Sequence, residues 1–519
     1  MVSRTSRRQT VSMRLRPWLK IAALMLCTCG GVSVSVRGAA QTDRPNIVFM
    51  LADDLGYGEL GCYGQKKILT PHIDRLALQG IRFTQHYSGA PVCAPSRCVL
   101  LTGKHTGHAQ IRGNLQTKPK PGDLAGVGQH PITDDVLTLA EVFQRAGYAT
   151  GAMGKWGLGP VASTGAPHRQ GFDLFFGYNC QSVAHSCYPP YLWRNDALVP
   201  LNQRPIPGHA QPVTGSVNMS DWIGEVYAPT RMTDEAVKFI QDHRQQPFFL
   251  YLPFIEPHVA MHPPKAAVEA YPAQWDDQPY RGQCGYLPHP RPHAGYAAMI
   301  STLDAHVGRI LAALEENGLT KNTLVVFTSD NGTTHPAPGD PVFGTGGVDA
   351  KFFQSTAGLR GFKGSVHEGG IRVPLIVRWP GRIQAGSVQD FPCYFADHFP
   401  TLCAAANLKA PSGLDGINLI PALTGKRPAA RKNPMLWVFP EYGGQVAVRL
   451  GNLKILRKGL QTKTPGDWEV YDMVKDRSES NDIAKSHPGI IRQAEAILRR
   501  EVLANETFPL EIPGVQPRR

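Results

Sequence analysis

The sequence predicts an α/β protein with a large, mixed, mostly parallel sheet sandwiched by helices, followed by a small α+β domain with a short antiparallel sheet. Short apolar runs alternate with helical patterns along the first 395 residues, and these runs are continuously apolar. Continuous apolar strands are typical of a parallel sheet that is covered on both faces. From about residue 396 several short β-like runs follow one another, which predicts the second domain.

The elements can be placed from their residue types. We expect strands at 46–51, 149–153, 248–252, 324–327 and 374–377. Helices are expected at 73–79 and 136–146, each followed by glycine, and along the apolar positions between Met299 and Leu314. In the second domain we expect strands at 437–439, 445–450, 454–457 and 468–472, and a helix from 488 to about 502. Pro/Gly-rich loops at 117–132, 159–171, 186–230 and 262–293 are expected to form the rim of a cleft.

The first forty residues have the pattern of a secretory signal peptide. Seven cations and no acid occur there, around an apolar run at 21–26, and small residues at 38–40 suggest cleavage after Ala40. Ser6-Arg7-Arg8 leaves a twin-arginine signal open, and Leu26-Cys27-Thr28-Cys29 leaves lipid anchoring open. We therefore expect a signal peptide at 1–40, a catalytic domain at 41–395 and a C-terminal subdomain at 396–519. The mature chain is expected to be periplasmic or extracellular, without a transmembrane segment.

Charge and cysteine content narrow the class of protein. The chain of 519 residues has a net charge of +13, and removing the seven cations of residues 1–40 leaves +6. This modest excess predicts no nucleic-acid patch and is compatible with anionic substrates. Eight cysteines remain after residue 40, at irregular spacings that match neither a zinc site nor a dense disulfide framework. Export would permit a bridge, for which Cys180 and Cys187 are a close pair.

Acidic and amide side chains follow two of the predicted strands. Asp53 and Asp54 come after the strand at 46–51, and Asp330 and Asn331 come after the strand at 324–327. The carboxyl ends of parallel strands meet at one edge of a sheet, where ligands bind. Either pair alone is more typical of a turn or helix cap, but together they favour a site for Ca²⁺, with Mg²⁺ as an alternative.

Four further cationic or titratable residues lie at comparable places: Arg97, Lys155, His258 and Lys363. Each of the last three taken singly is more typical of an ordinary surface or packed residue. Together with Arg97 they predict a pocket for a tetrahedral anion, because several cations can neutralise charge on several oxygens.

The most specific segment is Cys93-Ala94-Pro95-Ser96-Arg97, followed by Leu101-Thr102-Gly103. It resembles the signature of the type I, formylglycine-dependent sulfatases of the alkaline-phosphatase-like superfamily. The segments Gly154-Lys155-Trp156, Pro257-His258, 329–332 and 363–374 also resemble that family and occur in its order. The resemblance extends over roughly residues 44–500.

The resemblance implies a reaction. The motif cysteine, Cys93 here, is converted to formylglycine by a formylglycine-generating or other sulfatase-modifying enzyme that reads Pro95 and Arg97. One hydroxyl of the hydrated aldehyde attacks sulfur and displaces the alcohol. The other hydroxyl then loses its proton and expels sulfate, so the covalent intermediate breaks down without attack by water. The implied substrate is a sulfate ester, with a sulfated glycan favoured.

The resemblance also implies residue roles. Asp53, Asp54, Asp330 and Asn331 would bind the metal together with residue 93. Arg97 would hold the aldehyde hydrate. Lys155 and Lys363 would clamp sulfate oxygens, and His258 would protonate or hydrogen-bond the leaving oxygen.

One position departs from the family pattern. Gly157 stands where sulfatases commonly have a histidine that assists the nucleophile. We expect His185 to reach the same space, with His105, His335 or a metal-bound water as alternatives; His105, His108 and Arg112 line the cleft or serve structure. Three other functions stay open at this point: an arylsulfatase-like enzyme, a phosphate or phosphonate ester hydrolase of the same superfamily, or a non-catalytic binder of sulfated glycans.

Overall fold

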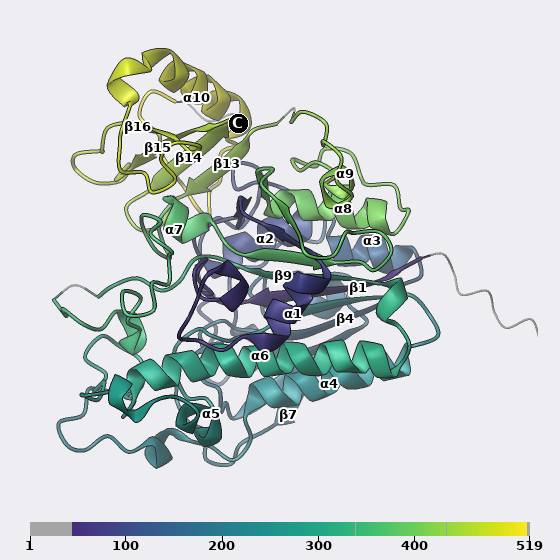
Figure 1. Cartoon of the computed structure of the whole chain (residues 1–519), viewed down its shortest axis with the longest axis vertical. Helices are drawn as coiled ribbons and strands as arrows, with labels where there is room; N and C mark the ends of the chain where they lie inside the picture. Colours follow the sequence, from purple (N-terminus) through teal and green to yellow (C-terminus); the bar gives the residue numbers. More distant parts are fainter. Residues whose placement is uncertain (1–43, 338, 432, 516–519) are drawn as a thin grey trace, which may run out of the picture. The chain divides into compact units, whose positions relative to one another are not determined.

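The computed structural model describes residues 44–515 except 338 and 432, so the predicted signal peptide lies outside the described residues. Ten strands form one sheet in the order β11-β2-β10-β9-β1-β8-β4-β5-β6-β7 (Figure 1). The pairs β9–β1, β1–β8, β8–β4 and β4–β5 are parallel, and β10, β6 and β7 run antiparallel to their neighbours. The expected mixed, mostly parallel sheet is confirmed. Its strands are β1 Asn46–Ala52, β2 Ile81–Phe83, β4 Ala149–Lys155, β5 Leu174–Tyr178, β6 Tyr191–Arg194, β7 Ala197–Pro200, β8 Phe248–Pro253, β9 Thr323–Ser329, β10 Leu375–Arg378 and β11 Ser387–Gln389.

Helices cover both faces of this sheet. Side chains alternate along β1, so that Ile47, Phe49 and Leu51 enter one core cluster while Val48 and Met50 enter the other. The first core contains residues of α2, α3 and α8, and the second contains residues of α1, α4 and α6 (Figure 1). The helices are α1 Pro71–Gln79, α2 Cys93–Thr102, α3 Leu139–Arg145, α4 Ala228–Asp242, α5 Lys265–Glu269, α6 Pro292–Glu316, α7 Glu368–Ile371, α8 His398–Ala405 and α9 Ile420–Leu423.

Two expectations from the sequence need correction. The helix expected from residue 136 begins at Leu139, because Thr138 caps it and exchanges hydrogen bonds with Glu141. The segments 186–230 and 262–293 are not all loop. In the first, β6 and β7 form a hairpin and α4 begins at Ala228; the second contains α5.

The C-terminal part has the expected antiparallel sheet. Its strands are β13 Met435–Phe439, β14 Gln445–Leu450, β15 Leu453–Lys458 and β16 Glu469–Asp472, and α10 (Pro488–Glu501) packs on them (Figure 1). One face of the sheet forms a core with α10, whereas Trp437, Phe439 and Tyr471 join the first core of the large sheet. The two sheets therefore share buried surface. Two short strands, β3 (His86–Tyr87) and β12 (Cys393–Tyr394), form a separate parallel pair.

The cysteines and the longest helix bear on the remaining expectations. All eight cysteines of the described part are free thiols, so Cys180 and Cys187 form no bridge. One described helix, α6, is long and apolar enough to cross a membrane, but 78% of its most apolar window is buried inside the protein. That burial fits a core helix of the large sheet.

Candidate active site

Cys93 is the first residue of α2 and lies at the carboxyl edge of the sheet. Its Sγ is 3.4 Å from Asp53 Oδ1 and 3.7 Å from Lys155 Nζ. The backbone N–H of Ala94 donates to Asn114 Oδ1 at 2.9 Å, which fixes the start of the helix. Burial and the Asp53 carboxylate raise the pKa of the Cys93 thiol. An unmodified Cys93 would therefore stay protonated and nucleophilically weak, which disfavours a thiolate mechanism.

The structure brings the two acidic pairs together. Asp53 and Asp54 follow β1, Asp330 and Asn331 follow β9, and the parallel register aligns Ala52 with Ser329. The Asp54 N–H donates to Asp330 Oδ1 at 3.1 Å, and Asn331 Nδ2 donates to Asp54 Oδ1 at 2.7 Å. Asp54 has a left-handed backbone (φ 65°), an uncommon conformation outside glycine that recurs at functional sites.

Three cations neutralise these three carboxylates. Lys155 is the last residue of β4, and its Nζ lies 2.5 Å from Asp53 Oδ2. Lys363 Nζ lies 2.7 Å from Asp54 Oδ2. Arg97 Nη2 lies 2.7 Å from Asp330 Oδ2 and 3.4 Å from Asp53 Oδ2, and its Nη1 donates to the Lys155 carbonyl. Arg97 thus holds two carboxylates and the strand end in one geometry.

Two of these buried carboxyl groups have pKa values shifted in opposite directions. Burial raises the pKa of Asp53, but the nearby charges of Lys155, His258 and Arg97 outweigh burial and bring the pKa well below its usual range. Burial and the neighbouring Asp53 raise the pKa of Asp330 to about 6, so that this carboxyl is the one that ionises with difficulty. A further cation at this place would favour its charged form.

The donor set fits a hard divalent cation. Oxygens of Asp53 and Asp54 lie with Cys93 Sγ and a His258 ring nitrogen within 4.8 Å of one another. The Oδ1 atom of Asn331 is buried and has no hydrogen-bond partner among the described residues. Carboxylate and amide oxygens are the ligands that Ca²⁺ and Mg²⁺ prefer. The orphaned amide oxygen is therefore explained if it is a metal ligand.

His258 and His185 lie together beside this cluster. His258 Nε2 is 3.5 Å from Asp54 Oδ2. The His185 ring, in the 3₁₀ turn η4 (Val183–His185), stacks on His258 with centroids 4.8 Å apart and planes 13° apart, and its Nδ1 is 2.9 Å from His209 Nε2. Burial and the charges of His258 and Lys155 lower the pKa of His185 well below its ordinary value. His185 therefore reaches the site as a neutral imidazole on the His258 side.

A residue that the sequence did not single out fills the space beside Gly157. Gly157 has a φ of 124°, and a Cβ on it would lie 2.3 Å from Gln181 Nε2. Gln181 is 4% exposed, and its Nε2 has no hydrogen-bond partner in the described part of the chain. It follows β5, the neighbour of β4, so the contact depends on strand order and leaves no signal in the local sequence.

The other histidines considered from the sequence have structural contacts. His105 and His108 stack on each other and face Asp415, with His108 Nδ1 2.9 Å from Asp415 Oδ2. Arg112 donates to the carbonyls of Ala109, Gly107 and Leu503. These contacts join the segment after α2 to Asp415 and Leu503 of the C-terminal part, so we assign these three residues to structure.

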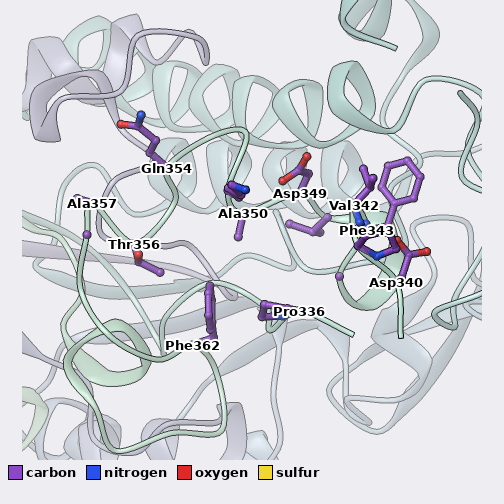
Figure 2. Close-up of a pocket in the computed structure, with 15 residues that line it drawn as sticks. Pro336, Asp340, Val342, Phe343, Asp349, Ala350, Gln354, Thr356, Ala357 and Phe362 are labelled. Atoms are coloured by element: carbon purple, nitrogen blue, oxygen red, sulfur yellow. Dashed lines mark hydrogen bonds between the residues drawn. The ribbon is translucent and has the colours of Figure 1, made fainter. Parts of the chain in front are cut away.

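A cavity of about 650 Å³ lies next to the catalytic cluster in the chain. It is lined by residues between 336 and 362, with Phe362 and Pro336 on one side and Asp349 and Ala350 on the other (Figure 2). Phe362 immediately precedes Lys363, so the cavity borders the segment that carries this lysine. The charged cluster itself is tightly packed and does not line the cavity.

The fold and this cluster are those of a metal-assisted ester hydrolase, and comparisons with known proteins give the family. The family model "Sulfatase" matches residues 45–408, and a second, "N-sulphoglucosamine sulphohydrolase, C-terminal", matches residues 362–502. The chain belongs to the sulfatase family. Its reaction is the hydrolysis of sulfate esters.

Individual relatives agree with the family. Human arylsulfatase A is 33% identical over 80% of this chain and 75% of its own length. The N-acetylgalactosamine-6-O-sulfatase of Bacteroides thetaiotaomicron is 29% identical over 93% of this chain and 98% of its own length. Among solved structures, Ps i-CgsB in complex with k-i-k-neocarrahexaose superposes with a TM-score of 0.71 at 26% identity, covering 88% of this chain and 92% of that one.

Proposed function

We propose that this protein is an exported sulfatase that removes sulfate from sulfated carbohydrates, with formylglycine formed from Cys93 and Ca²⁺ as the metal. The observation that carries the proposal is the cluster around Cys93, where three carboxylates, an unpaired amide oxygen and three cations meet at one edge of the sheet. Such a cluster suits a tetrahedral anion with its metal.

The carbohydrate substrate is supported by three similarities. The matched C-terminal model is named for an N-sulphoglucosamine sulphohydrolase. The Bacteroides N-acetylgalactosamine-6-O-sulfatase aligns over nearly both full lengths, more than arylsulfatase A does. The Ps i-CgsB structure contains a carrageenan oligosaccharide. We therefore favour a sulfated sugar over a phenol or sterol ester.

The residues divide the work by their contacts. Asp53, Asp54, Asp330 and Asn331 would hold the metal, which when bound lowers the pKa of the attacking hydroxyl and polarises a sulfate oxygen. Arg97 keeps Asp330 and Asp53 ionised and oriented. The two lysines would turn from the carboxylates they now contact toward sulfate oxygens, since a sulfate ester brings its own negative charge.

His258 is placed to serve the leaving group. Its Nδ1 hydrogen-bonds the Val259 carbonyl at 2.5 Å, which fixes the ring and leaves Nε2 directed to the charged cluster. Burial, followed by Lys363 and Lys155, lowers the pKa of His258 well below its ordinary value. The arrival of an anionic substrate and of the leaving oxygen's developing charge would favour its protonated form, as general acid catalysis needs.

The test is a panel of sulfated mono- and oligosaccharides, measured beside 4-nitrophenyl sulfate and a steroid sulfate by release of inorganic sulfate. The proposal expects the highest kcat/KM on a sulfated sugar. A higher kcat/KM on the aryl or steroid ester than on every sugar of the panel would contradict the carbohydrate assignment. Export is tested separately, by N-terminal sequencing of the secreted protein, which should begin at Gln41.

A further inference from the structure

The turn between β13 and β14 reaches the start of the nucleophile helix from the C-terminal sheet. Glu441 Oε1 accepts the Asn114 N–H at 2.7 Å, and Asn114 Oδ1 in turn accepts the Ala94 N–H at 2.9 Å. Directly after the turn, at the first residue of β14, Gln445 Nε2 donates to the Gly364 carbonyl at 2.7 Å. The turn is therefore anchored on both sides of the active site, at residues adjacent to Cys93 and to Lys363.

Tyr442 occupies the tip of this turn. A Cβ on Gly364 would lie 2.8 Å from Tyr442 Cε1, so the tyrosine ring packs directly on the glycine that follows Lys363. Lys363 Nζ in turn lies 2.7 Å from Asp54 Oδ2. Tyr442 therefore packs on the segment whose lysine reaches the cluster around Cys93.

The exposure of Tyr442 is unusual in this protein. It is 57% exposed, and it is the one Phe, Tyr or Trp of the described residues that falls in the exposed class. Its backbone is left-handed (φ 53°), and two glycines follow it. A tyrosine is costly in this conformation, which glycine or asparagine would adopt more readily. One face of its ring packs near Phe439, with centroids 5.7 Å apart, which holds the ring in place.

An exposed, rigidly held aromatic ring beside an anion site suits a particular kind of ligand. A pyranose ring has an apolar face of C–H groups that packs on an aromatic face, while its hydroxyls stay in water or bind a phenolic hydroxyl. We propose that Tyr442 is a specificity residue, a platform on which a sugar ring of the substrate stacks while its sulfate lies in the cluster around Cys93. The inference rests on the proposed carbohydrate substrate and adds the residue that recognises it.

The test compares the variants Tyr442→Ala and Tyr442→Phe with the wild-type protein on two substrates. These are the sulfated oligosaccharide that the protein hydrolyses best and 4-nitrophenyl sulfate. For Tyr442→Ala we expect kcat/KM on the oligosaccharide to fall about three- to tenfold, the range of aromatic contacts, mainly through KM. Tyr442→Phe keeps the ring, so its kcat/KM on the oligosaccharide should stay within about twofold of the wild-type value. Turnover of 4-nitrophenyl sulfate by Tyr442→Ala should change less than about twofold, because its sulfate site is intact.

Binding gives a second readout that does not depend on turnover. In the inactive Cys93→Ala background, calorimetry should show the oligosaccharide binding about three- to tenfold more weakly when Tyr442→Ala is added. Val474→Ala is the matched control, because Val474 is 67% exposed and lies in the turn after β16. This substitution should change the kcat/KM of neither substrate. Thermal unfolding of each variant confirms that the fold is kept.

The outcomes separate the two proposals. Unchanged oligosaccharide kinetics and binding in Tyr442→Ala would overturn the platform, and so would an equal loss on both substrates or a loss on the aryl ester alone. If the wild-type protein releases sulfate from no sugar in the panel, the proposed function fails before Tyr442 is tested.

Discussion

At the scale of single residues, the site is a balance of buried charges in which each group sets the state of its neighbours. Arg97 and Lys155 keep Asp53 ionised, whereas Asp330 shares its surroundings with another carboxylate and has its pKa raised. The thiol of Cys93 is kept protonated by the same surroundings. Three predictions follow at this scale, one each for the nucleophile, the metal and the residue that assists the nucleophile.

The first prediction concerns the chemical state of residue 93. We expect active protein to contain formylglycine there, because a buried neutral thiol is a poor nucleophile. Peptide mass spectrometry of active material should show the mass of the aldehyde or its hydrate in the peptide that contains residue 93. Cys93→Ala should abolish turnover and leave the thermal unfolding midpoint close to normal. Fully active protein that contains only unmodified Cys93 would falsify this assignment.

The second prediction concerns the metal. Asp330→Ala and Asn331→Ala should each lower the metal content measured by elemental analysis, and Asp330→Ala should also abolish activity. The reason is the loss of a hard oxygen donor beside Asp53 and Asp54, where the buried Asn331 Oδ1 has no hydrogen-bond partner among the described residues. When the metal has been removed by a chelator, adding calcium should raise the thermal unfolding midpoint of the wild-type protein. The same addition should raise the midpoint of the two variants less. Full activity in protein shown by elemental analysis to be free of metal would contradict the prediction.

The third prediction separates two candidates for assisting residue 93. His185→Ala should lower kcat by about a hundredfold or more if His185 is the general base, with a covalent intermediate accumulating. Its stacking on His258 offers a different role, in which the loss would appear with poor leaving groups and not with 4-nitrophenol. Gln181→Ala is the comparison, since Gln181 lies against Gly157 with an unpaired amide nitrogen. Near-normal turnover of His185→Ala on the best substrate would exclude it as the base.

At the scale of elements, the start of α6 is fixed by an ion-pair network that depends on pH. The His293 N–H donates to Asp276 Oδ1 at 2.7 Å, and its ring nitrogens lie 3.4 Å from Asp276 and 3.1 Å from Asp349. Burial lowers the pKa of His293, but hydrogen bonds from its ring to Asp276 and Asp349 raise it to about 9. The charged imidazole thus joins the long core helix to the two loops that carry Asp276 and Asp349.

The fourth prediction follows from this network. The folded pKa of His293 lies above its unfolded value of about 6.5, so its stabilisation is fully present below pH 6.5 and is lost as pH rises through about 9. His293→Gln should lower the free energy of unfolding by roughly 2 kcal/mol at pH 6, and by much less at pH 9.5. Urea unfolding at both pH values measures the difference. His487→Gln, a change to a ring that bonds Ser486 and the Ile483 carbonyl, is the control and should show no such trend. A loss that is equal at both pH values would contradict the assignment.

At the scale of the whole molecule, buried charges tie the C-terminal sheet to the segment that carries the site. Lys454, on β15, is 1% exposed, and its Nζ lies 2.9 Å from Glu368 Oε1 and 2.9 Å from Glu479 Oε1. Glu368 begins α7, five residues after Lys363. Burial raises the pKa of Glu479, but Lys454 lowers it to about 2. The C-terminal part therefore helps to position the segment that carries Lys363.

The fifth prediction tests this tie. Lys454→Met removes the cation that two buried carboxylates share. Among the described residues it leaves Glu368 with only Arg372, and Glu479 with only His367. We expect it to lower the free energy of unfolding by about 3 kcal/mol, the lower end for breaking a buried ion pair. Chemical unfolding measures the loss. Lys475→Met is the matched control, because Lys475 is 84% exposed and 3.8 Å from Asp472, and it should change stability by less than about 1 kcal/mol. A small effect at Lys454 would contradict the assignment, because it would show that this ion pair does not tie the C-terminal sheet to the segment that carries Lys363.

The sequence by itself determined the class of fold and most of the site. Apolar strand runs predicted β1, β4, β8, β9 and β10, because continuous burial on two faces demands continuous apolar residues. Residue types directly after those strands placed Asp53, Asp54, Asp330, Asn331 and Lys155 at one edge, and parallel pairing of the strands brings them together. These predictions were local, or needed only the rule that parallel strands end together.

Tertiary structure decided what depends on strand order and on contacts between distant segments. The orphaned oxygen of Asn331 and the packing of Gln181 against Gly157 exist only because β9 pairs with β1 and β5 pairs with β4. His185 lies on His258, and Tyr442 lies on Gly364, although 73 and 78 residues separate these pairs in the chain. Because a side chain carries no local sign of its distant partner, such contacts are fixed only when the strands pair and the distant segments pack together.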